Sequence, residues 1–221
     1  MSNARTKSTH RPPPASHRRA PWLWIALGAV VLLAAVVAVF ASRESESTTA
    51  AGVEETRSVE VTGTALAPLA DGTDPALGQP VPVVRGASFD GTPVAIGGSG
   101  ERMVVAFVAH WCPHCQLEVP LLSAHLADNP MPAGVDLVTV ATSTTATRPN
   151  YPPSAWLERE AWPGQVLADD DDGTTAQAFG LTGLPHFVAV DAAGEVVGRM
   201  SGEITTEQFD QLTALAMGTA G

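Results

Sequence analysis

Cysteine is scarce in this chain, since only two of its 221 residues are Cys, and this excludes a disulfide-rich scaffold. Glycine, at 20 residues, is too rare for a collagen, and Lys and Glu are too rare for a long coiled coil. Cations are also few. The first 20 residues hold five of the 12 Lys and Arg and no acid, which leaves seven cations against 23 acids for the rest of the chain. Phosphate binding needs a basic face, so a nucleic-acid partner is not expected.

An uncharged segment explains the uneven charge. From Trp22 to Ala41 the chain has no charged residue over twenty positions, and about 20 apolar residues suffice to cross a bilayer as a helix. Cations precede the segment and acids follow it, which predicts a cytoplasmic N-terminus by the positive-inside rule. We therefore expect a cytoplasmic basic tail at 1–20, a transmembrane helix at 21–41 and an extracytoplasmic remainder. A cleavable signal peptide ending near Ala41 is the alternative.

The exported part divides into a stem and a domain. Residues 42–75 are rich in Ser, Thr, Glu, Ala and Gly, which predicts a flexible acidic stem. Residues 76–217 alternate apolar strands with amphipathic helices, which predicts an α/β domain whose sheet has one antiparallel flank. Within it we expect a hairpin joining 87–89 to 93–96, and strands at 102–109, 135–141, 165–169, 186–191 and 196–200. Helices are expected at 113–127 and 154–161, and two more begin with the capping-box spacings Thr174 to Gln177 and Thr205 to Gln208. The stem has room for a short strand around 59–61.

The two cysteines form the tetrad Cys112-Pro-His-Cys115, where a buried strand turns into a helix. A C-x-x-C in an exported chain is a small disulfide, half of a metal site, a haem attachment site or a redox pair. Haem attachment needs His after the second Cys, where this chain has Gln116. A disulfide that closes so short a loop restricts the unfolded chain very little. A structural zinc site needs four ligands, and only His110 and His114 stand nearby to complete it.

Redox chemistry fits the position of the pair best. Cys112 begins a helix, where unpaired N–H groups and the helix dipole favour a thiolate, and such positions lower a thiol pKa from about 8.5 into the range of about 3.5–7.5. Cys115 lies further into the helix and is more shielded. This predicts an exposed attacking Cys112 and a buried resolving Cys115.

The longer string Cys112-Pro-His-Cys115-Gln-Leu-Glu118-Val-Pro120, preceded by Trp111 and an apolar strand, resembles the C-x-x-C-x-x-E-x-P pattern of the membrane-anchored TlpA/ResA-type thiol-disulfide oxidoreductases of the thioredoxin superfamily. The resemblance covers about residues 76–217 and the anchor. It implies a thioredoxin-like fold, a central mixed sheet flanked by helices, with a redox-active Cys112–Cys115 disulfide and no metal or cofactor. It also implies a cis-proline loop at Leu184-Pro185, and substrate contacts by Trp111, Pro113 and Leu184.

By this resemblance the partners are exported thiol or disulfide proteins, apocytochrome c being one candidate, and a membrane redox partner that recycles the pair. The direction of electron flow depends on that recycling partner. Two other functions stay open: a peroxiredoxin-like peroxide reductase, although its motif would need other residues at Val105 and Ala109, and a copper or other metal chaperone that adds a distant His such as His186.

Two departures from the family pattern point to particular residues. Thioredoxins have a buried acid where this chain has Ala106, so Glu118, three residues after Cys115, is the candidate for proton handling. The Pro-His dipeptide resembles the oxidising DsbA-type motif. His114 is expected to favour the Cys112 thiolate, by a hydrogen bond or electrostatically, and to make the pair more oxidising than thioredoxin.

The remaining features predict structure more than chemistry. Asp169 to Asp172 resembles a calcium loop but lacks the required acids at Ala168 and Phe179. It is interpreted as an acidic turn stabilised by the helix N-terminus that follows. His125 has no evident partner and is expected to be solvated. Tyr151 and Trp156, in an insertion at 143–165, either cover the site or pack into the core.

Overall fold

The computed structural model describes residues 52–70, 72–98 and 100–219. The predicted cytoplasmic tail at 1–20 and membrane helix at 21–41 lie outside these residues. None of the helices in the described part of the chain is both long and apolar enough to cross a membrane.

The main sheet has five strands in the order β6 (Gln165–Ala168), β5 (Val135–Ala141), β4 (Arg102–Val108), β7 (His186–Val190) and β8 (Val196–Ser201). β4 lies at the centre, parallel to β5 on one side and antiparallel to β7 on the other. β6 extends the parallel half and β8 extends the antiparallel half. This confirms the predicted mixed sheet with one antiparallel flank, and β5 has the predicted bounds.

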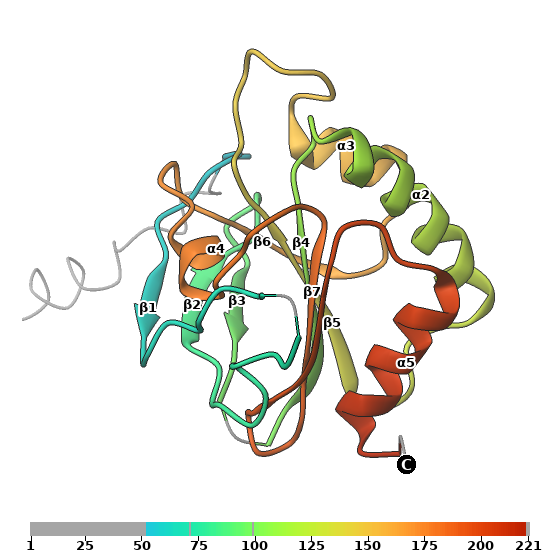
Figure 1. Cartoon of the computed structure of the whole chain (residues 1–221). Helices are drawn as coiled ribbons and strands as arrows, with labels where there is room; N and C mark the ends of the chain where they lie inside the picture. The colour runs from blue at the N-terminus through green and yellow to red at the C-terminus, as the bar shows by residue number, and fades with distance from the viewer. Residues whose placement is uncertain (1–51, 71, 99, 220–221) are drawn as a thin grey trace, which may run out of the picture. The chain divides into compact units, whose positions relative to one another are not determined.

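In the part of the chain that the structure describes, four helices accompany the sheet: α2 (Pro113–Asp128), α3 (Pro153–Arg159), α4 (Thr174–Ala178) and α5 (Thr206–Met217). α2 and α5 cover one face, while α4 and a small second sheet lie on the other (Figure 1). α5 begins with the predicted capping box, in which Thr205 Oγ1 accepts from Gln208 N–H and Gln208 Oε1 accepts from Thr205 N–H. The two bonds satisfy donors that the helix leaves free.

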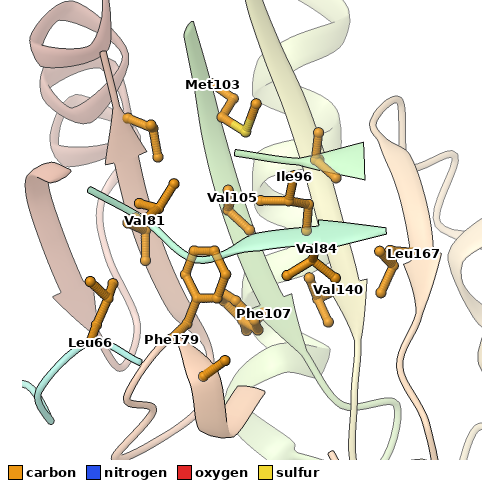
Figure 2. Close-up of a cluster of buried hydrophobic side chains, with 14 of the residues drawn as sticks. Leu66, Val81, Val84, Ile96, Met103, Val105, Phe107, Val140, Leu167 and Phe179 are labelled. Atoms are coloured by element: carbon orange, nitrogen blue, oxygen red, sulfur yellow. The ribbon is translucent and has the colours of Figure 1, made fainter. Parts of the chain in front are cut away.

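Alternate residues of β4 serve two separate hydrophobic cores. Val105 and Phe107 pack toward β2, β3 and Phe179 (Figure 2), and Val104 and Ala106 pack toward α2 and α5. All of these side chains are fully buried. A strand covered on both faces needs a continuous apolar run, which is why its position is evident from the sequence.

The second sheet includes part of the segment that the sequence predicts as a flexible stem. β1 (Glu60–Thr62) pairs antiparallel with β2 (Val83–Ala87), which in turn pairs antiparallel with β3 (Pro93–Ile96). The β2–β3 pair is the expected hairpin, but its first strand lies at 83–87 and not at 87–89, because residues 88–92 form the turn. The prediction of a flexible stem is therefore wrong over residues 60–62, because β2, the middle strand of this sheet, supplies their hydrogen-bond partners. The short strand that the sequence allows around 59–61 is present, one residue further on.

Contacts on either side of β1 hold the rest of this segment on the domain. Arg57 donates from its guanidinium to the carbonyl of Phe89 at 2.7 Å. Leu66 is buried, and its N–H donates to the carbonyl of Ala178 at 2.8 Å. Residues 52–70 and 72–75 thus belong to the folded domain, while residues 42–51 of the predicted stem lie outside the described residues.

The acidic turn caps α4, as the sequence predicts, although the cap differs in detail. The carboxylate of Asp169 accepts from the N–H groups of Thr175 at 2.9 Å and Ala176 at 3.2 Å, and Asp170 accepts from Thr174 N–H at 2.8 Å. Gly173 is the N-cap, in the left-handed region. The expected Thr174 capping box is therefore wrong, because carboxylates from the preceding turn reach the free donors first.

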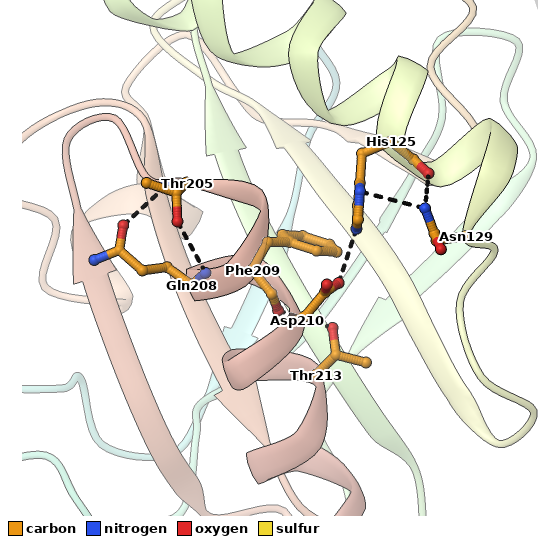
Figure 3. Close-up of polar contacts among 7 residues, drawn as sticks. All are labelled: His125, Asn129, Thr205, Gln208, Phe209, Asp210 and Thr213. Atoms are coloured by element: carbon orange, nitrogen blue, oxygen red, sulfur yellow. Dashed lines mark hydrogen bonds and ion pairs between the residues drawn. The ribbon is translucent and has the colours of Figure 1, made fainter.

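His125 links α2 to α5. Its Nε2 lies 2.8 Å from Asp210 Oδ1, and the backbone carbonyl of His125 accepts from Asn129 Nδ2 at 3.1 Å (Figure 3). The His125 side chain is 15% exposed. The expectation of a solvated His125 without a partner is therefore wrong, because α5 brings Asp210 against the face of α2 that carries it.

Candidate active site

Cys112 is the N-cap of α2, with extended backbone angles, and Pro113 follows at the first helical position. Its N–H donates to the carbonyl of Ala109 at 3.0 Å, which completes the turn between β4 and the helix. Cys112 is 6% exposed and Cys115 is fully buried. Cys112 is the less buried of the two, as predicted, but the expectation of an exposed Cys112 is wrong, because Cys112 packs in the same hydrophobic cluster as Cys115 and against the Leu184 loop. Both thiols are free.

The two thiols differ in electrostatic environment. Burial raises the pKa of the Cys115 thiol, and the neighbouring Cys112 and Glu118 raise it further. Cys112 stands instead at the N-terminus of α2, beside the N–H groups that the first turn of the helix leaves free. The pair therefore combines a position suited to an attacking thiolate with a second thiol that keeps its proton.

The loop opposite Cys112 has the predicted conformation. The Leu184-Pro185 peptide bond is cis, and the Leu184 carbonyl lies 3.6 Å from Cys112 Sγ. Leu184 thus brings a backbone group up to the sulfur from a loop 72 residues away in the sequence.

A pocket of about 430 Å³ opens beside Cys112. Its lining residues come from four loops and α4: Trp111, Cys112, Thr142, Ser143, Asp172, Gly173, Ala176, Gln177, Leu181, Gly183 and Leu184. Of the predicted substrate contacts, Trp111 and Leu184 are part of this lining. Pro113 is exposed at the start of α2 and is not part of it.

Glu118 is buried beneath the cysteines, with 2% of its surface exposed. Its Oε2 accepts from the N–H of Ile204 at 3.2 Å, and its Oε1 has no hydrogen-bond partner within the described residues. Burial raises the pKa of Glu118 to about 7, and the Glu203 carboxylate adds to the rise while the Ile204 bond opposes it. A carboxyl that titrates near neutral pH is suited to taking up and releasing a proton.

His114 is directed away from the role that the sequence suggests. Its side chain is 63% exposed, and its Nδ1 lies 2.5 Å from Glu203 Oε1 in the loop before α5. The expected hydrogen bond toward Cys112 is thus replaced by one to Glu203, and the Glu203 carboxylate offsets any charge on the ring.

His110 has a supporting role that sequence reasoning missed. Its Nδ1 donates to the carbonyl of Pro149 at 2.6 Å, and its Nε2 accepts from the N–H of Thr145 at 3.3 Å. With both ring nitrogens bonded to backbone, the tautomer is determined and neither nitrogen is free for a metal. Within the described residues no group of three or more His, Cys, Asp or Glu side chains is arranged to hold a metal ion.

The insertion both frames the site and packs into the core. Trp111 donates from Nε1 to the carbonyl of Ser143 at 2.8 Å, and the Arg148 guanidinium lies 5.0 Å from the centre of its ring. Tyr151 packs edge-on against His110 at 5.9 Å between ring centres. Trp156, in contrast, is 2% exposed and packs in the cluster that contains the cysteines.

Comparisons with known proteins agree with this geometry. The Redoxin family matches residues 76–215. A thiol:disulfide interchange protein DsbE homologue of Paracoccus denitrificans is 28% identical over 137 residues, covering 60% of this chain and 70% of its own.

Solved structures share the fold. A thioredoxin-family thiol:disulfide interchange protein from Chlorobium tepidum has 25% identity and a TM-score of 0.52, covering 67% of this chain and all of its own. A DsbF homologue from Corynebacterium diphtheriae has 16% identity and a TM-score of 0.55, covering 68% of this chain and 98% of its own. The chain belongs to the Redoxin family and is a thiol-disulfide oxidoreductase of the thioredoxin superfamily.

Proposed function

We propose that this chain exchanges its Cys112/Cys115 dithiol and disulfide with exported protein substrates, from a domain held at the outer face of the membrane by residues 21–41. The observation that supports it most directly is the arrangement around Cys112 Sγ. The sulfur lies at the N-terminus of α2, borders the pocket, and faces the Leu184 carbonyl at 3.6 Å. A substrate strand that pairs with this loop places its own sulfur beside Cys112.

Reduction of a substrate proceeds in two displacements. The Cys112 thiolate attacks one sulfur of the substrate disulfide, so that a mixed disulfide forms and the other substrate sulfur leaves as a thiolate, which takes up a proton. Cys115 then loses its proton and attacks Cys112 Sγ, which releases the second substrate thiol and leaves the Cys112–Cys115 disulfide. Two electrons pass to the substrate, and the reverse sequence oxidises a substrate dithiol.

Glu118 supplies the proton transfer that the second displacement needs. Cys115 is buried and its pKa is raised, so it requires a base close by in the interior. Glu118 lies on the same helix three residues on, and its pKa of about 7 lets it exist in both forms near neutral pH. The substrate class, exported proteins with apocytochrome c as one candidate, rests on the DsbE-type relative and on the charge pattern around residues 21–41.

A trapping experiment tests the exchange. Cys115→Ser is expected to accumulate mixed disulfides between Cys112 and exported proteins, visible on non-reducing gels and identified by mass spectrometry. Cys112→Ser, the matched control, is expected to trap none, because it lacks the attacking sulfur. Equal trapping by the two variants would contradict the assigned roles.

Membrane attachment needs its own test. The full chain is expected to stay with the membrane fraction after a high-salt wash, and protease added outside spheroplasts is expected to remove the domain. Recovery of a soluble form that begins near Ser42 would indicate a cleaved signal peptide instead.

The electron direction is tested by titrating the pair against glutathione. The Pro-His dipeptide predicts a potential above that of thioredoxin, about −270 mV. A value at or below that of thioredoxin would favour a dedicated reductase.

A further inference from the structure

The loop between β8 and α5 contacts three parts of the active site within three successive residues. The N–H of Gly202 donates to the carbonyl of Pro185 at 2.8 Å. The Glu203 carboxylate accepts from His114, and the N–H of Ile204 donates to Glu118. This short segment therefore connects the cis-proline loop to His114 and Glu118 in the first turns of α2.

His114 and Glu118 differ sharply in exposure although they are one helical turn apart. The His114 side chain is 63% exposed, Glu118 is 2% exposed, and the Glu203 side chain between them is 45% exposed. Glu203 is thus in partial contact with solvent, which lets its charge change without unfolding the core.

We propose that Glu203 is a positioning residue of the redox site: its carboxylate holds the His114 ring outward and, with Ile204, places a negative charge over Glu118, so that it sets the charge surrounding the cysteine pair. This inference rests on the proposed function and names a residue outside the C-x-x-C helix that regulates it.

The charge of Glu203 acts in two ways. It opposes ionisation of Glu118, whose pKa it helps to raise, and it offsets the imidazolium charge that would otherwise favour the Cys112 thiolate. The groups that face Glu118 are Cys115 on its own helix, and Glu203 and the Ile204 amide on the loop packed against it. Among them Glu203 is the one carboxylate that can be neutralised without altering the helix.

The first test measures Glu118 directly, by NMR titration of its side-chain carboxyl carbon in the folded protein with both cysteines reduced. Glu203→Gln keeps the size of the side chain and removes its charge. We expect its Glu118 titration midpoint to fall by about 0.3–1 pH unit, because a nearby negative charge is lost. Glu203→Asp, which keeps the charge, is expected to remain close to wild type.

A matched control is Glu195→Gln, in the exposed turn between β7 and β8 at the other end of the strands. It makes the same change in net charge and is expected to leave the Glu118 midpoint unchanged. Thermal unfolding of each variant verifies that the fold is kept.

The second test measures the thiol–disulfide exchange equilibrium of the protein with dithiothreitol at pH 5.5. Glu203→Gln is expected to favour the reduced protein by about two- to five-fold, the size of an exposed ion pair. In a His114→Gln background, Glu203→Gln is expected to leave the equilibrium unchanged, because the ring whose charge Glu203 offsets is absent.

An unchanged Glu118 midpoint in Glu203→Gln would overturn the inference, as would equal shifts in Glu203→Gln and Glu195→Gln. The proposed function fails differently, through loss of trapping by Cys115→Ser in an otherwise wild-type chain. Normal trapping together with an unchanged midpoint would therefore reject the role of Glu203 alone.

Discussion

Two carboxylates on opposite faces of the main sheet meet contrasting surroundings. Asp74 pairs with the guanidinium of Arg199, through Nε at 2.8 Å and through Nη2, and this pairing lowers the pKa of Asp74. Glu118 has a single donor, the Ile204 N–H, and burial raises its pKa to about 7. A buried charge with full partners stays ionised and serves structure, whereas a buried carboxyl left with one donor keeps a proton that chemistry can use.

In the Asp74–Arg199 pair, every nitrogen of the Arg199 guanidinium donates a hydrogen bond. Besides its bonds to Asp74, the guanidinium donates from Nη1 to the carbonyls of Ala67 at 3.0 Å and Phe179 at 3.3 Å. Arg199 thereby links Ala67 and Asp74 to β8. Glu118 lacks such a network, since its Oε1 has no hydrogen-bond partner within the described residues.

The largest effect on stability is expected from removing Arg199, the partner of Asp74. Arg199→Met removes the partner of Asp74, and the carbonyls of Ala67 and Phe179 also lose their donor, so the free energy of unfolding should fall by about 3–5 kcal/mol. Urea unfolding at pH 7 measures it. Arg85→Met, an exposed arginine on β2, is the control and should change the free energy by less than about 0.5 kcal/mol. Equal losses would show that the pairing is not what stabilises this face.

His186 provides the next test, because it is fully buried and neither of its ring nitrogens has a hydrogen-bond partner within the described residues. Burial, aided by Arg199, lowers its pKa to about 4. Between about pH 6.5 and 4 the unfolded chain therefore binds more protons, so stability is lost as pH falls through this window, by about 3 kcal/mol.

The measurement is urea unfolding of wild type and His186→Leu at pH 7 and pH 4. The stability of the variant relative to wild type should improve by about 3 kcal/mol on acidification, whatever the cost of repacking. A difference that is independent of pH would contradict a neutral buried His186.

Glu118 changes stability with pH in the opposite direction to His186. Its folded pKa of about 7 lies above the usual 4.5, so the folded state holds the extra proton and stability falls as pH rises from about 4.5 to 7. Glu118→Gln removes this loss and should gain about 1–3 kcal/mol relative to wild type between pH 5 and pH 8. Its exchange rate should lose the corresponding pH dependence. Urea unfolding of wild type and Glu118→Gln at pH 5 and pH 8 measures this gain, and Glu195→Gln is the control with the same change in charge.

The smallest effect is expected at the surface. The His125–Asp210 pair between α2 and α5 (Figure 3) has a partner that is 59% exposed. Solvent screens it, so Asp210→Asn should lower the free energy of unfolding by about 0.2–1 kcal/mol, and less at high salt. A loss as large as that from Arg199→Met would remove the distinction between buried and exposed pairs.

Much of the site was predictable from short stretches of sequence. The C-x-x-C pair at a strand-to-helix turn, the Leu184-Pro185 loop and Glu118 were all identified, and the structure brings Cys112 to Leu184 and buries Glu118 under the cysteines. The partner of His114 was not predictable, because Glu203 lies 89 residues away and nothing in either local pattern refers to the other. The metal interpretation of His110 failed because its ring bonds to the backbone of an insertion.

The sequence by itself determined the strands and helices, since apolar periodicity and caps act over a few residues and make the elements of the mixed sheet evident before any contact is known. Only the tertiary structure decided which charges are paired and which are left to titrate. Asp74 and Arg199 are 125 residues apart, and Ile204 and Glu118 are 86 apart. Electrostatic environment depends on burial and on donors from distant segments, and these exist only once the chain has folded.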